Sequence, residues 1–259
     1  MEVTILASGS KGNAAYIEDG DTAILIDAGI SYRQITLRMG EKANRLASLE
    51  GIIVSHEHSD HTKGLEQTLK RTMAPVYTAK KTYTKIKDKL PMDHTMTPIE
   101  EDVAFMVGSL IITPLKTSHD AAHSLGFIIE TNSKQLVFIT DTGFLQEDDF
   151  HRIRNAHMYV LESNYDVALL FDSARPFYLK KRIDSVRGHL SNADSAYYLT
   201  QLIGPRTHSI VLAHPSQECN TESYTLATLH DVFAAYDKVP EDYDIHVAKQ
   251  HQPSKVFKI

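Results

Sequence analysis

The sequence predicts an α/β fold built as an αββα sandwich, that is, two mixed β-sheets flanked by helices. Strand-like segments occupy the first 28 residues, a second strand-rich block occupies the middle of the chain, and helical segments are interspersed. No long Pro/Gly/Ser linker, repeat or low-complexity tract divides the 259 residues. We therefore expect a single domain spanning residues 1–259.

The first half of the chain alternates short apolar segments with turn residues. Residues 3–6, 14–17 and 23–26 are expected to be strands, because glycine, asparagine and aspartate residues separate them. The short apolar run 51–55 (Gly-Ile-Ile-Val-Ser) predicts a buried strand. Helices are expected at 31–38, 62–71 and 80–90, with a strand at 75–78.

The second half of the chain is predicted in the same way. Residues 105–115 and 127–140 are apolar enough for strands, and the turn residues Asn132 and Ser133 predict a hairpin within the second segment. The other expected strands are 158–161, 209–213 and 244–248, and the other expected helices are 148–153, 178–183, 192–203 and 223–234. Helices interspersed with strands in this way favour two sheets covered by helices.

The composition argues against some classes of protein and leaves one unusual feature. The formal net charge of −6 argues against a nonspecific nucleic-acid coat, but not against a nuclease whose bound cations add positive charge. Cys219 is the only cysteine, which suits the reducing cytoplasm. We expect no membrane partner, because the N-terminus has no signal-peptide pattern and no apolar run approaches roughly 20 residues. The unusual feature is the 14 histidines, since histidine is a frequent metal ligand.

Several histidines gather in the segment 55–61, Ser-His-Glu-His-Ser-Asp-His, directly after a predicted buried strand. His56 and His58 are two residues apart and can share one metal ion, while a tight loop can turn Asp60 and His61 toward a second. Neutral imidazole and carboxylate are the ligands expected for zinc, manganese or iron. The alternative is a polar surface loop in which the histidines occur by chance.

This segment resembles the signature of the metallo-β-lactamase superfamily, which implies the metallo-β-lactamase fold and further ligands at the ends of later strands. The implied ligands are His119, then Asp141, whose carboxylate bridges both ions, and His214. His123 competes with His119 but does not match the family's pattern. Asp27 is implied to orient a ligand loop by hydrogen bonding, with an ordinary turn aspartate as the alternative.

The expected chemistry follows from a pair of neighbouring ions. Two divalent ions about 3.5–4 Å apart, bridged by a carboxylate and by hydroxide derived from water, suit in-line hydrolysis. We expect two such ions per chain, zinc or manganese with iron as a further choice, and hydroxide activated by the metal as nucleophile. Asp60 and His189 are expected to take part directly in catalysis. The seven expected ligands are His56, His58, Asp60, His61, His119, Asp141 and His214.

Further motifs, spread over nearly the whole chain, indicate the branch of the superfamily. They are 6–14 (Leu-Ala-Ser-Gly-Ser-Lys-Gly-Asn-Ala), 161–166 (Leu-Glu-Ser-Asn-Tyr-Asp), 178–183 (Tyr-Leu-Lys-Lys-Arg-Ile), 188–192 (Gly-His-Leu-Ser-Asn), 213–220 (Ala-His-Pro-Ser-Gln-Glu-Cys-Asn) and 247–253 (Val-Ala-Lys-Gln-His-Gln-Pro). Together they resemble the YycJ/WalJ family, which implies a 5′–3′ DNA exonuclease with a proposed role in DNA repair. Pro215 departs from the leucine usual at that place in the family.

Two polar loops suit a phosphodiester substrate. Ser8, Ser10 and Asn13 lie in a glycine-containing loop whose N–H groups and hydroxyls can hold a phosphate. His189 and Ser191 precede a predicted helix, whose N-terminus favours anions. His189 is expected to protonate the leaving oxygen or to hold the scissile phosphate. The alternative is that Ser191 or Asn192 only caps the helix and that His189 is structural.

Other polar residues receive weaker interpretations. Lys180, Lys181, Arg182 and Arg187 are expected to form a basic rim for a nucleic-acid backbone, with solvated helix faces as the alternative. Glu162 is interpreted as structural or as a support for a ligand.

The sequence thus predicts a cytoplasmic two-metal phosphodiesterase that acts on nucleic acid, DNA rather than RNA. The enzymatic alternative is a hydrolase of a small phosphodiester, a thioester or a lactone. The alternative from a different class is a binding module that holds metal without turnover. The complete ligand set counts against that last reading, because a binding role does not need an open pair of bridged ions.

Overall fold

The computed structural model describes residues 1–259 and contains two seven-stranded mixed sheets. In the first sheet the strand order is β14-β1-β2-β3-β4-β5-β6. Strands β1 to β3 are antiparallel to one another, whereas β3 to β6 are parallel. The bounds are β1 Glu2–Ala7, β2 Ala14–Asp19, β3 Thr22–Ile26, β4 Gly51–Ile53, β5 Val76–Ala79, β6 Met96–Ile99 and β14 Phe257–Lys258.

The second sheet has the order β13-β12-β11-β10-β9-β8-β7. Strands β10 to β13 are parallel, and β7 to β10 are antiparallel to their neighbours. The bounds are β7 Phe105–Val107, β8 Leu110–Lys116, β9 Leu125–Glu130, β10 Gln135–Ile139, β11 Met158–Glu162, β12 Ser209–Ala213 and β13 Asp244–Val247.

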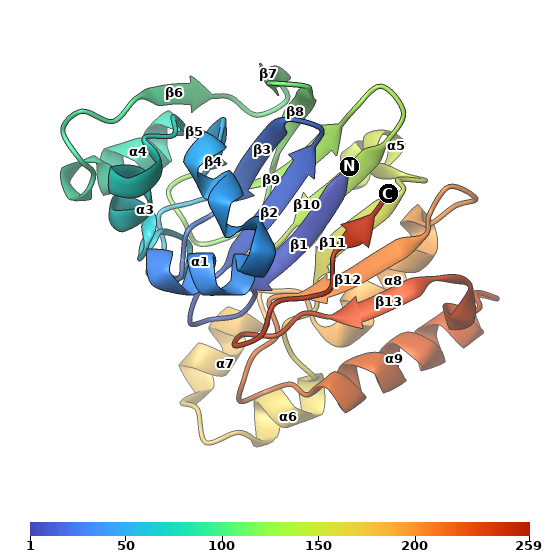
Figure 1. The fold of residues 1–259 in the computed structure, drawn as a ribbon. Coiled ribbons are helices and arrows are strands. Elements are labelled where there is room, and N and C mark those ends of the chain that lie inside the picture. Colours follow the sequence, from blue (N-terminus) through green and yellow to red (C-terminus); the bar gives the residue numbers. More distant parts are fainter.

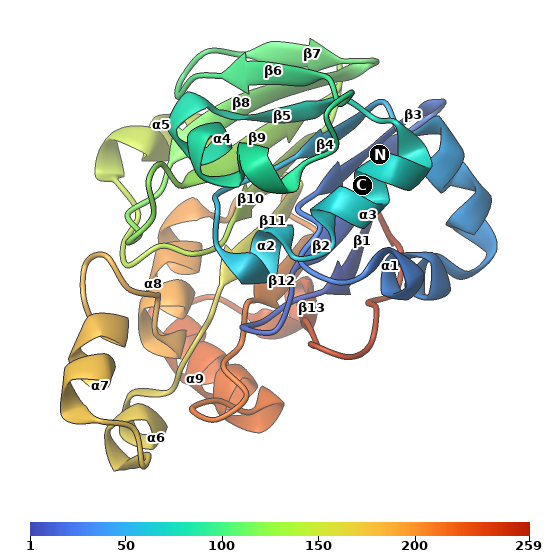
Figure 2. The same ribbon diagram turned by 90° about the vertical axis from the view of Figure 1, so that its left-hand side faces the viewer.

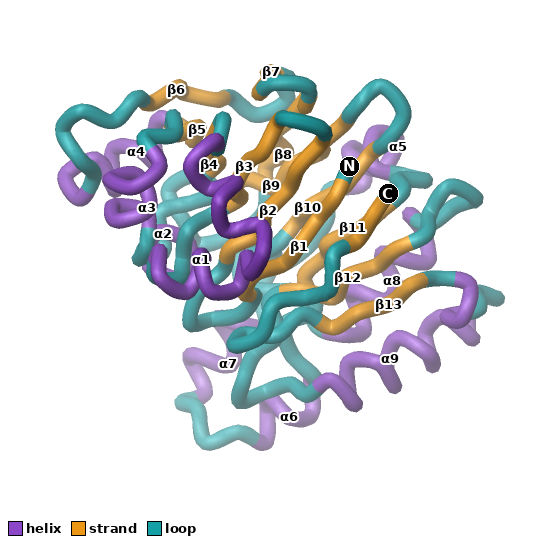
Figure 3. Tube along the Cα trace, viewed as in Figure 1, coloured by secondary structure: helices purple, strands orange, loops and turns teal.

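Helices flank the two sheets on their outer faces, so that the chain forms four layers (Figures 1 and 3). The α-helices are α1 Tyr32–Met39, α2 Ser59–Thr62, α3 Leu65–Thr72, α4 Lys80–Ile86, α5 Phe150–Ile153, α6 Val167–Asp172, α7 Phe177–Ile183, α8 Asn192–Leu202 and α9 Glu222–Ala235. Short 3-10 helices occupy Gly40–Ser48, Lys87–Lys89, Glu147–Asp149 and Pro240–Asp242. None of these helices is long and apolar enough to cross a membrane.

Three clusters of buried apolar side chains hold the layers together. The central one joins the inner faces of both sheets and includes Ile17 and Ile26 of the first sheet with Phe127 and Val160 of the second. The other two pack helices onto the outer faces, α1, α3 and α4 on the first sheet and α5, α8 and α9 on the second. The predicted αββα sandwich is therefore confirmed. That the chain is a single domain stays a prediction.

The structure differs from the predicted elements in several places. Residues 105–115 form not one strand but the hairpin β7–β8, because Gly108 adopts a left-handed turn conformation with φ +54°. The helix predicted at 62–71 is preceded by the separate short helix α2, and α3 begins only at Leu65. The edge strand β6 and the 3-10 helix Gly40–Ser48 were not predicted; β6 is mostly exposed and lacks a continuous apolar run.

Helices α6 and α7 form an arm that projects from one end of the sandwich (Figure 2). The arm has its own small apolar cluster, in which Leu170 and Ile183 pack with Tyr165 and Cys219. Tyr165 also donates a hydrogen bond to Asp184, which ends α7. The arm is therefore anchored at its base to the segments that follow β11 and β12.

The loop after β3, which contains Gly29, packs closely against the histidine-rich loop that contains Asp60 and His61. The N–H of Asn13 donates to the carbonyl of Asp60, and the N–H of Gly29 donates to the carbonyl of Asn13. A Cβ added to Gly29 would lie 1.6 Å from the Asp60 carbonyl oxygen. Only glycine fits at this contact, which holds the loop that carries Asp60 and His61.

Replacing Gly29 with alanine should break this contact, because the new methyl group overlaps backbone atoms that cannot move aside. We expect the free energy of unfolding, measured by urea denaturation, to fall by about 3 kcal/mol or more. Gly20→Ala is the matched control, since nothing lies within 4 Å of its added Cβ and only the left-handed backbone, φ +59°, is unfavourable. That substitution should cost about 1–2 kcal/mol. Equal losses in the two variants would contradict the close-packing explanation.

Candidate metal centre

Three of the predicted site residues adopt left-handed backbone conformations just after strands. Asp27 follows β3 with φ 59°, Asp141 follows β10 with φ 55°, and His214 follows β12 with φ 55°. Such conformations are unfavourable for residues other than glycine and persist only where the surroundings impose them. Each one turns the chain sharply at the end of a strand and directs the side chain toward the same edge of the sandwich.

His56, His58 and His119 form the first cluster of possible metal ligands, with one nitrogen of each within 4.8 Å of the others. Nδ1 of His58 lies 3.3 Å from Nε2 of His119. Two of these residues come from the loop after β4 and the third from the loop after β8, so the cluster joins the two sheets.

The second cluster consists of Asp60, His61, Asp141 and His214. The Oδ2 atom of Asp60 lies 3.5 Å from Nε2 of His61 and 3.6 Å from Nε2 of His214. Asp141 stands between the two clusters. Its Oδ2 is 3.2 Å from Nε2 of His61, and its Oδ1 is 3.7 Å from Nε2 of His119. The structure thus brings all seven predicted ligands together at one place.

Acceptors outside the clusters hold the imidazole rings in place. Nδ1 of His61 donates to Oδ2 of Asp27 at 2.7 Å, and Nδ1 of His119 donates to the carbonyl of Gly188 at 3.0 Å. Carboxylates and carbonyls only accept, so the proton of each ring lies on Nδ1 and Nε2 is left to face the centre. Asp27 also accepts from the backbone N–H of Ser55, which ties the strand-end turn to the ligand loop.

Glu162 is fully buried and serves two histidines at once. Its Oε1 accepts from Nδ1 of His214 and from Nδ1 of His189, both at 2.8 Å, while its Oε2 accepts from the backbone N–H groups of Thr142 and Leu190. One carboxylate therefore orients a possible metal ligand and the predicted catalytic histidine. From the sequence, Glu162 was expected only to be structural or to support a ligand; its position as the last residue of β11 was the available signal.

Several buried polar atoms at the centre have no hydrogen-bond partner. They include Nε2 of His56, Nε2 of His214 and both carboxylate oxygens of Asp141. Buried polar atoms are normally paired, because an unpaired one keeps its full desolvation cost. Imidazole nitrogens and carboxylate oxygens, which are ligands of transition metals, thus converge unpaired on one space, so the donor set fits metal ions.

The pKa values show how strongly the centre attracts positive charge. Burial alone would lower the pKa of His214, but Asp141, Asp60 and Glu162 raise it to about 10. Burial alone would raise the pKa of Asp141, but His214 and His61 hold it well below the usual range. Positive charge on these rings thus balances the buried carboxylates, and a bound metal ion would supply that positive charge instead.

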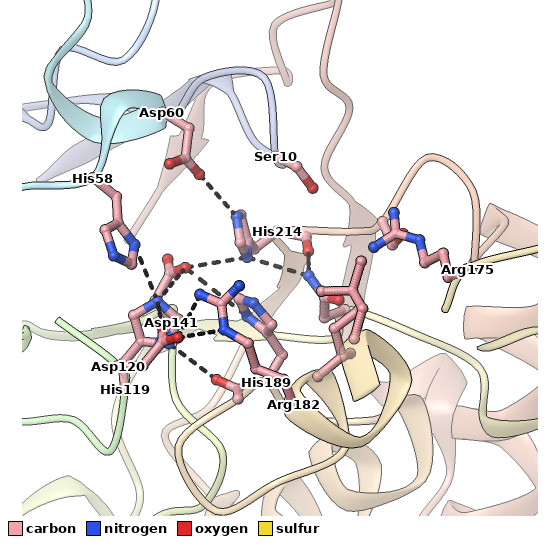
Figure 4. Close-up of a pocket in the computed structure, with 15 residues that line it drawn as sticks. Ser10, His58, Asp60, His119, Asp120, Asp141, Arg175, Arg182, His189 and His214 are labelled. Carbon is pink, nitrogen blue, oxygen red and sulfur yellow. Dashed lines mark hydrogen bonds and ion pairs between the residues drawn. The ribbon is translucent and has the colours of Figure 1, made fainter. Parts of the chain in front are cut away.

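An open pocket of about 220 Å³ leads to the centre (Figure 4). Only Leu179 and Ile183 among its 15 lining residues are hydrophobic. The polar lining residues are Ser10, His58, Asp60, His119, Asp120, Asp141, Asn164, Arg175, Arg182, Gly188, His189, His214 and Ser216. His56 and His61 lie beneath the floor, fully buried.

Of the residues predicted to contact phosphate, only Ser10 and His189 line the pocket. The Ser8 hydroxyl accepts from the N–H of His214, so Ser8 supports the turn that carries this histidine. The side-chain amide nitrogen of Asn13 is hydrogen-bonded to the carbonyl of Asp60 and to Nε2 of His61. Ser191 caps α8 by accepting from the N–H of Asp194, and its hydroxyl hydrogen goes to the Asp194 carboxylate. The structure thus gives Ser8, Asn13 and Ser191 buried supporting contacts and does not place them at the pocket.

The predicted basic rim is mostly not found at the pocket. Lys180 is buried with its ammonium group on the Phe171 carbonyl, and Lys181 lies over the ring of Phe171. Arg182 is the one member that lines the pocket, where it pairs with Asp120. Arg175, which the sequence analysis did not single out, lines it as well. Its location depends on how the arm folds back, which no local pattern indicates.

Comparisons with known proteins agree with this geometry. The family model of the β-lactamase superfamily domain matches residues 22–214. The chain is 31% identical to the exodeoxyribonuclease YycJ of Bacillus anthracis over 265 residues, 99% of this chain and 98% of the relative. It is 32% identical to the exodeoxyribonuclease WalJ of Streptococcus pneumoniae serotype 2 (strain D39), over 92% of this chain and 90% of the relative.

The fold has close structural counterparts too. The crystal structure of the metallo-β-lactamase fold protein YhfI from Bacillus subtilis superposes with a TM-score of 0.75 over 98% of both chains, at 17% identity. From the family match, the full-length relatives and the shared fold, we conclude that this chain belongs to the metallo-β-lactamase superfamily and, within it, to the family of YycJ and WalJ.

Proposed function

We propose that this chain is a two-metal phosphodiesterase that cleaves DNA as a 5′–3′ exonuclease. The observation that carries the proposal is a polar, arginine-lined pocket over two adjoining ligand clusters, with Asp141 of the second cluster 3.7 Å from His119 of the first. Relatives that match nearly the full length of the chain are named exodeoxyribonucleases, which supports DNA over RNA. A cytoplasmic location and a role in DNA repair stay predictions from the sequence.

The pocket lining favours phosphate over an acyl substrate. A thioester or lactone brings an apolar acyl chain, for which only Leu179 and Ile183 offer apolar contact. Arg175 and Arg182 instead present guanidinium groups, which match the geometry of phosphate oxygens. A volume of about 220 Å³ is also below the roughly 300–1,000 Å³ of pockets that enclose a small ligand. The reacting phosphate and its immediate surroundings then enter, while most of a longer substrate remains outside.

Two divalent ions, zinc or manganese with iron as a further choice, are proposed to occupy the clusters. His56, His58 and His119 would hold one, Asp60, His61 and His214 would hold the other, and Asp141 would contribute to both. Such a pair supplies a Lewis acid for the phosphate and lowers the pKa of a water molecule. Asp27 and Glu162 fix the rings of His61 and His214 and so preserve the spacing between the clusters.

His189 is proposed as the proton donor to the leaving oxygen. Its Nδ1 is held by Glu162, so its Nε2 edge is turned to the pocket, and a fifth of its side chain is exposed there. A buried carboxylate behind an imidazole fixes the orientation of the ring and leaves its Nε2 to face the substrate. Burial alone would raise the pKa of Glu162, but His189 and His214 lower it to about 2, so this carboxylate stays charged. Asp60 lies on the other side of the pocket, where it is proposed to position the attacking water (Figure 4).

A nuclease assay tests the proposed function directly. End-labelled single- and double-stranded DNA and RNA would be incubated with the chain and added Mn²⁺ or Zn²⁺. We expect DNA to be shortened from its 5′ end, the direction that the resemblance to the YycJ/WalJ family implies. If only bis(p-nitrophenyl) phosphate is cut, the nucleic-acid proposal fails, and if only a thioester or lactone is cut, the phosphodiester proposal fails as well.

Asp141→Asn tests the shared ligand, because asparagine keeps the shape of the side chain and removes its charge. We expect the variant to lose most of its bound metal by elemental analysis, and its activity with it. Asp120→Asn is the matched control, since Asp120 lines the same pocket but belongs to neither cluster and pairs with Arg182. Full metal occupancy in Asp141→Asn would refute the bridging assignment.

His189→Ala tests the proton donor. The variant should keep its metal content, because the ring is held by Glu162 and belongs to neither of the two proposed ligand sets. Turnover of DNA should slow by roughly 10²–10⁴-fold, the usual scale for general acid catalysis. The loss should be smaller for a substrate with a p-nitrophenolate leaving group, which needs no proton. An unchanged rate on DNA would make His189 structural.

A further inference from the structure

Arg175 lies on the wall of the pocket, away from the histidine-rich loop. Figure 4 shows Arg175 and His58 on opposite sides of the pocket, with the Ser10 hydroxyl between Asp60 and Arg175. The residue immediately precedes Pro176, at the start of α7, so the arm formed by α6 and α7 carries it to the pocket. Its side chain is three-quarters buried.

The guanidinium group of Arg175 is fixed but only partly used. Its Nε donates to Oε2 of Glu218 at 2.9 Å, and its two Nη groups have no partner in the protein. An arginine offers five N–H donors, so four of them remain. Glu218 is two-thirds exposed, and an ion pair with an exposed carboxylate is weak in water. The free edge of Arg175 is thus ready to bind an anion.

The short turn that follows His214 connects Arg175 to the metal centre. Glu218, which binds Arg175, lies four residues after His214. The hydroxyl oxygen of Ser216 accepts from the backbone N–H groups of Glu218 and Cys219. Because that oxygen is already an acceptor twice, its hydrogen remains to be donated, and Ser216 lines the pocket. Arg175 and Ser216 therefore form a pair of donors beside His214.

Arg182 is not equivalent to Arg175. Both its Nε and one Nη contact Oδ2 of Asp120, the residue that follows His119. The Asp120 carboxylate therefore balances the positive charge of Arg182, next to the loop that carries His119. We place the reacting phosphate in this part of the pocket. Arg175 is the pocket arginine whose donors are not committed to a carboxylate beside the metal ligands.

We propose that Arg175, assisted by Ser216 and Ser10, binds a second phosphate, that of the nucleotide next to the scissile bond. The inference rests on the proposed function and narrows its substrate class. The scissile phosphate occupies the ligand clusters, so an arginine on the opposite wall meets the next anionic group along the strand. The preferred substrate therefore carries two phosphates one nucleotide apart, and an isolated phosphodiester fills only half of the site.

Binding of thymidine 3′,5′-bisphosphate tests this proposal without turnover, since it carries two phosphates on one nucleotide and no phosphodiester bond. Isothermal titration calorimetry on the metal-loaded chain would compare it with thymidine 3′-monophosphate and thymidine 5′-monophosphate. We expect the bisphosphate to bind about 10- to 100-fold more tightly than the better monophosphate, the gain of a charged hydrogen-bonded contact. Arg175→Ala should remove that gain.

Arg33→Ala is the matched control, because Arg33 is an exposed arginine of α1 outside the pocket, and it should retain the gain. Metal content and thermal unfolding of both variants would establish that they are folded. Equal affinities for bisphosphate and monophosphates in the unchanged protein, or a gain that survives Arg175→Ala, would overturn the proposal. Binding is measured apart from cleavage, so the two proposals can fail separately. DNA cleavage without tighter binding of the bisphosphate would overturn only this inference. Tighter binding of the bisphosphate without DNA cleavage would overturn only the exonuclease function.

Discussion

The structure depends on negative charge that is buried where strands of both sheets end. Asp27, Asp141 and Glu162 are almost completely removed from water, and Asp60 lies beside them at the pocket. Isolated carboxylates at such depth are very unfavourable, so each must face a cation or donors. Histidines supply those contacts in this structure, and the carboxylates around His61 and His214 raise the pKa of both rings despite their burial.

The backbone is shaped to make that concentration of charge possible. Left-handed turns at Asp27, Asp141 and His214 bring side chains from three different strands to one edge. Gly29 lets the loop after β3 touch the histidine-rich loop, which a larger residue would push away. The large core between the sheets keeps these strand ends in register, so unfavourable local conformations are held by packing that lies elsewhere.

The arm supplies one wall of the pocket over the centre. Superfamily members share the ligand geometry among different reactions, so the surrounding wall must distinguish substrates. In this chain the wall combines Leu179 and Ile183 with Arg175 and Arg182, all four on or next to α7. The arm is tied to the metal centre through Glu218, near His214, and through Asp120, next to His119. The pocket wall and the segments that carry the ligand clusters are therefore joined by direct ion pairs.

Much of the fold and of the metal centre was already determined by the sequence. Apolar runs between turn residues predicted most strands, and the dense segment 55–61 directly after one of them indicated a metal site, because ligands close in sequence must be close in space. Only the tertiary structure decided the roles of residues that act across the chain. Glu162 reaches His189 and His214, 27 and 52 residues away, and Ser8, Asn13 and Ser191 turn inward to support loops. The direction of a side chain at a strand end depends on which loops pack beside it, and that is a property of the folded chain.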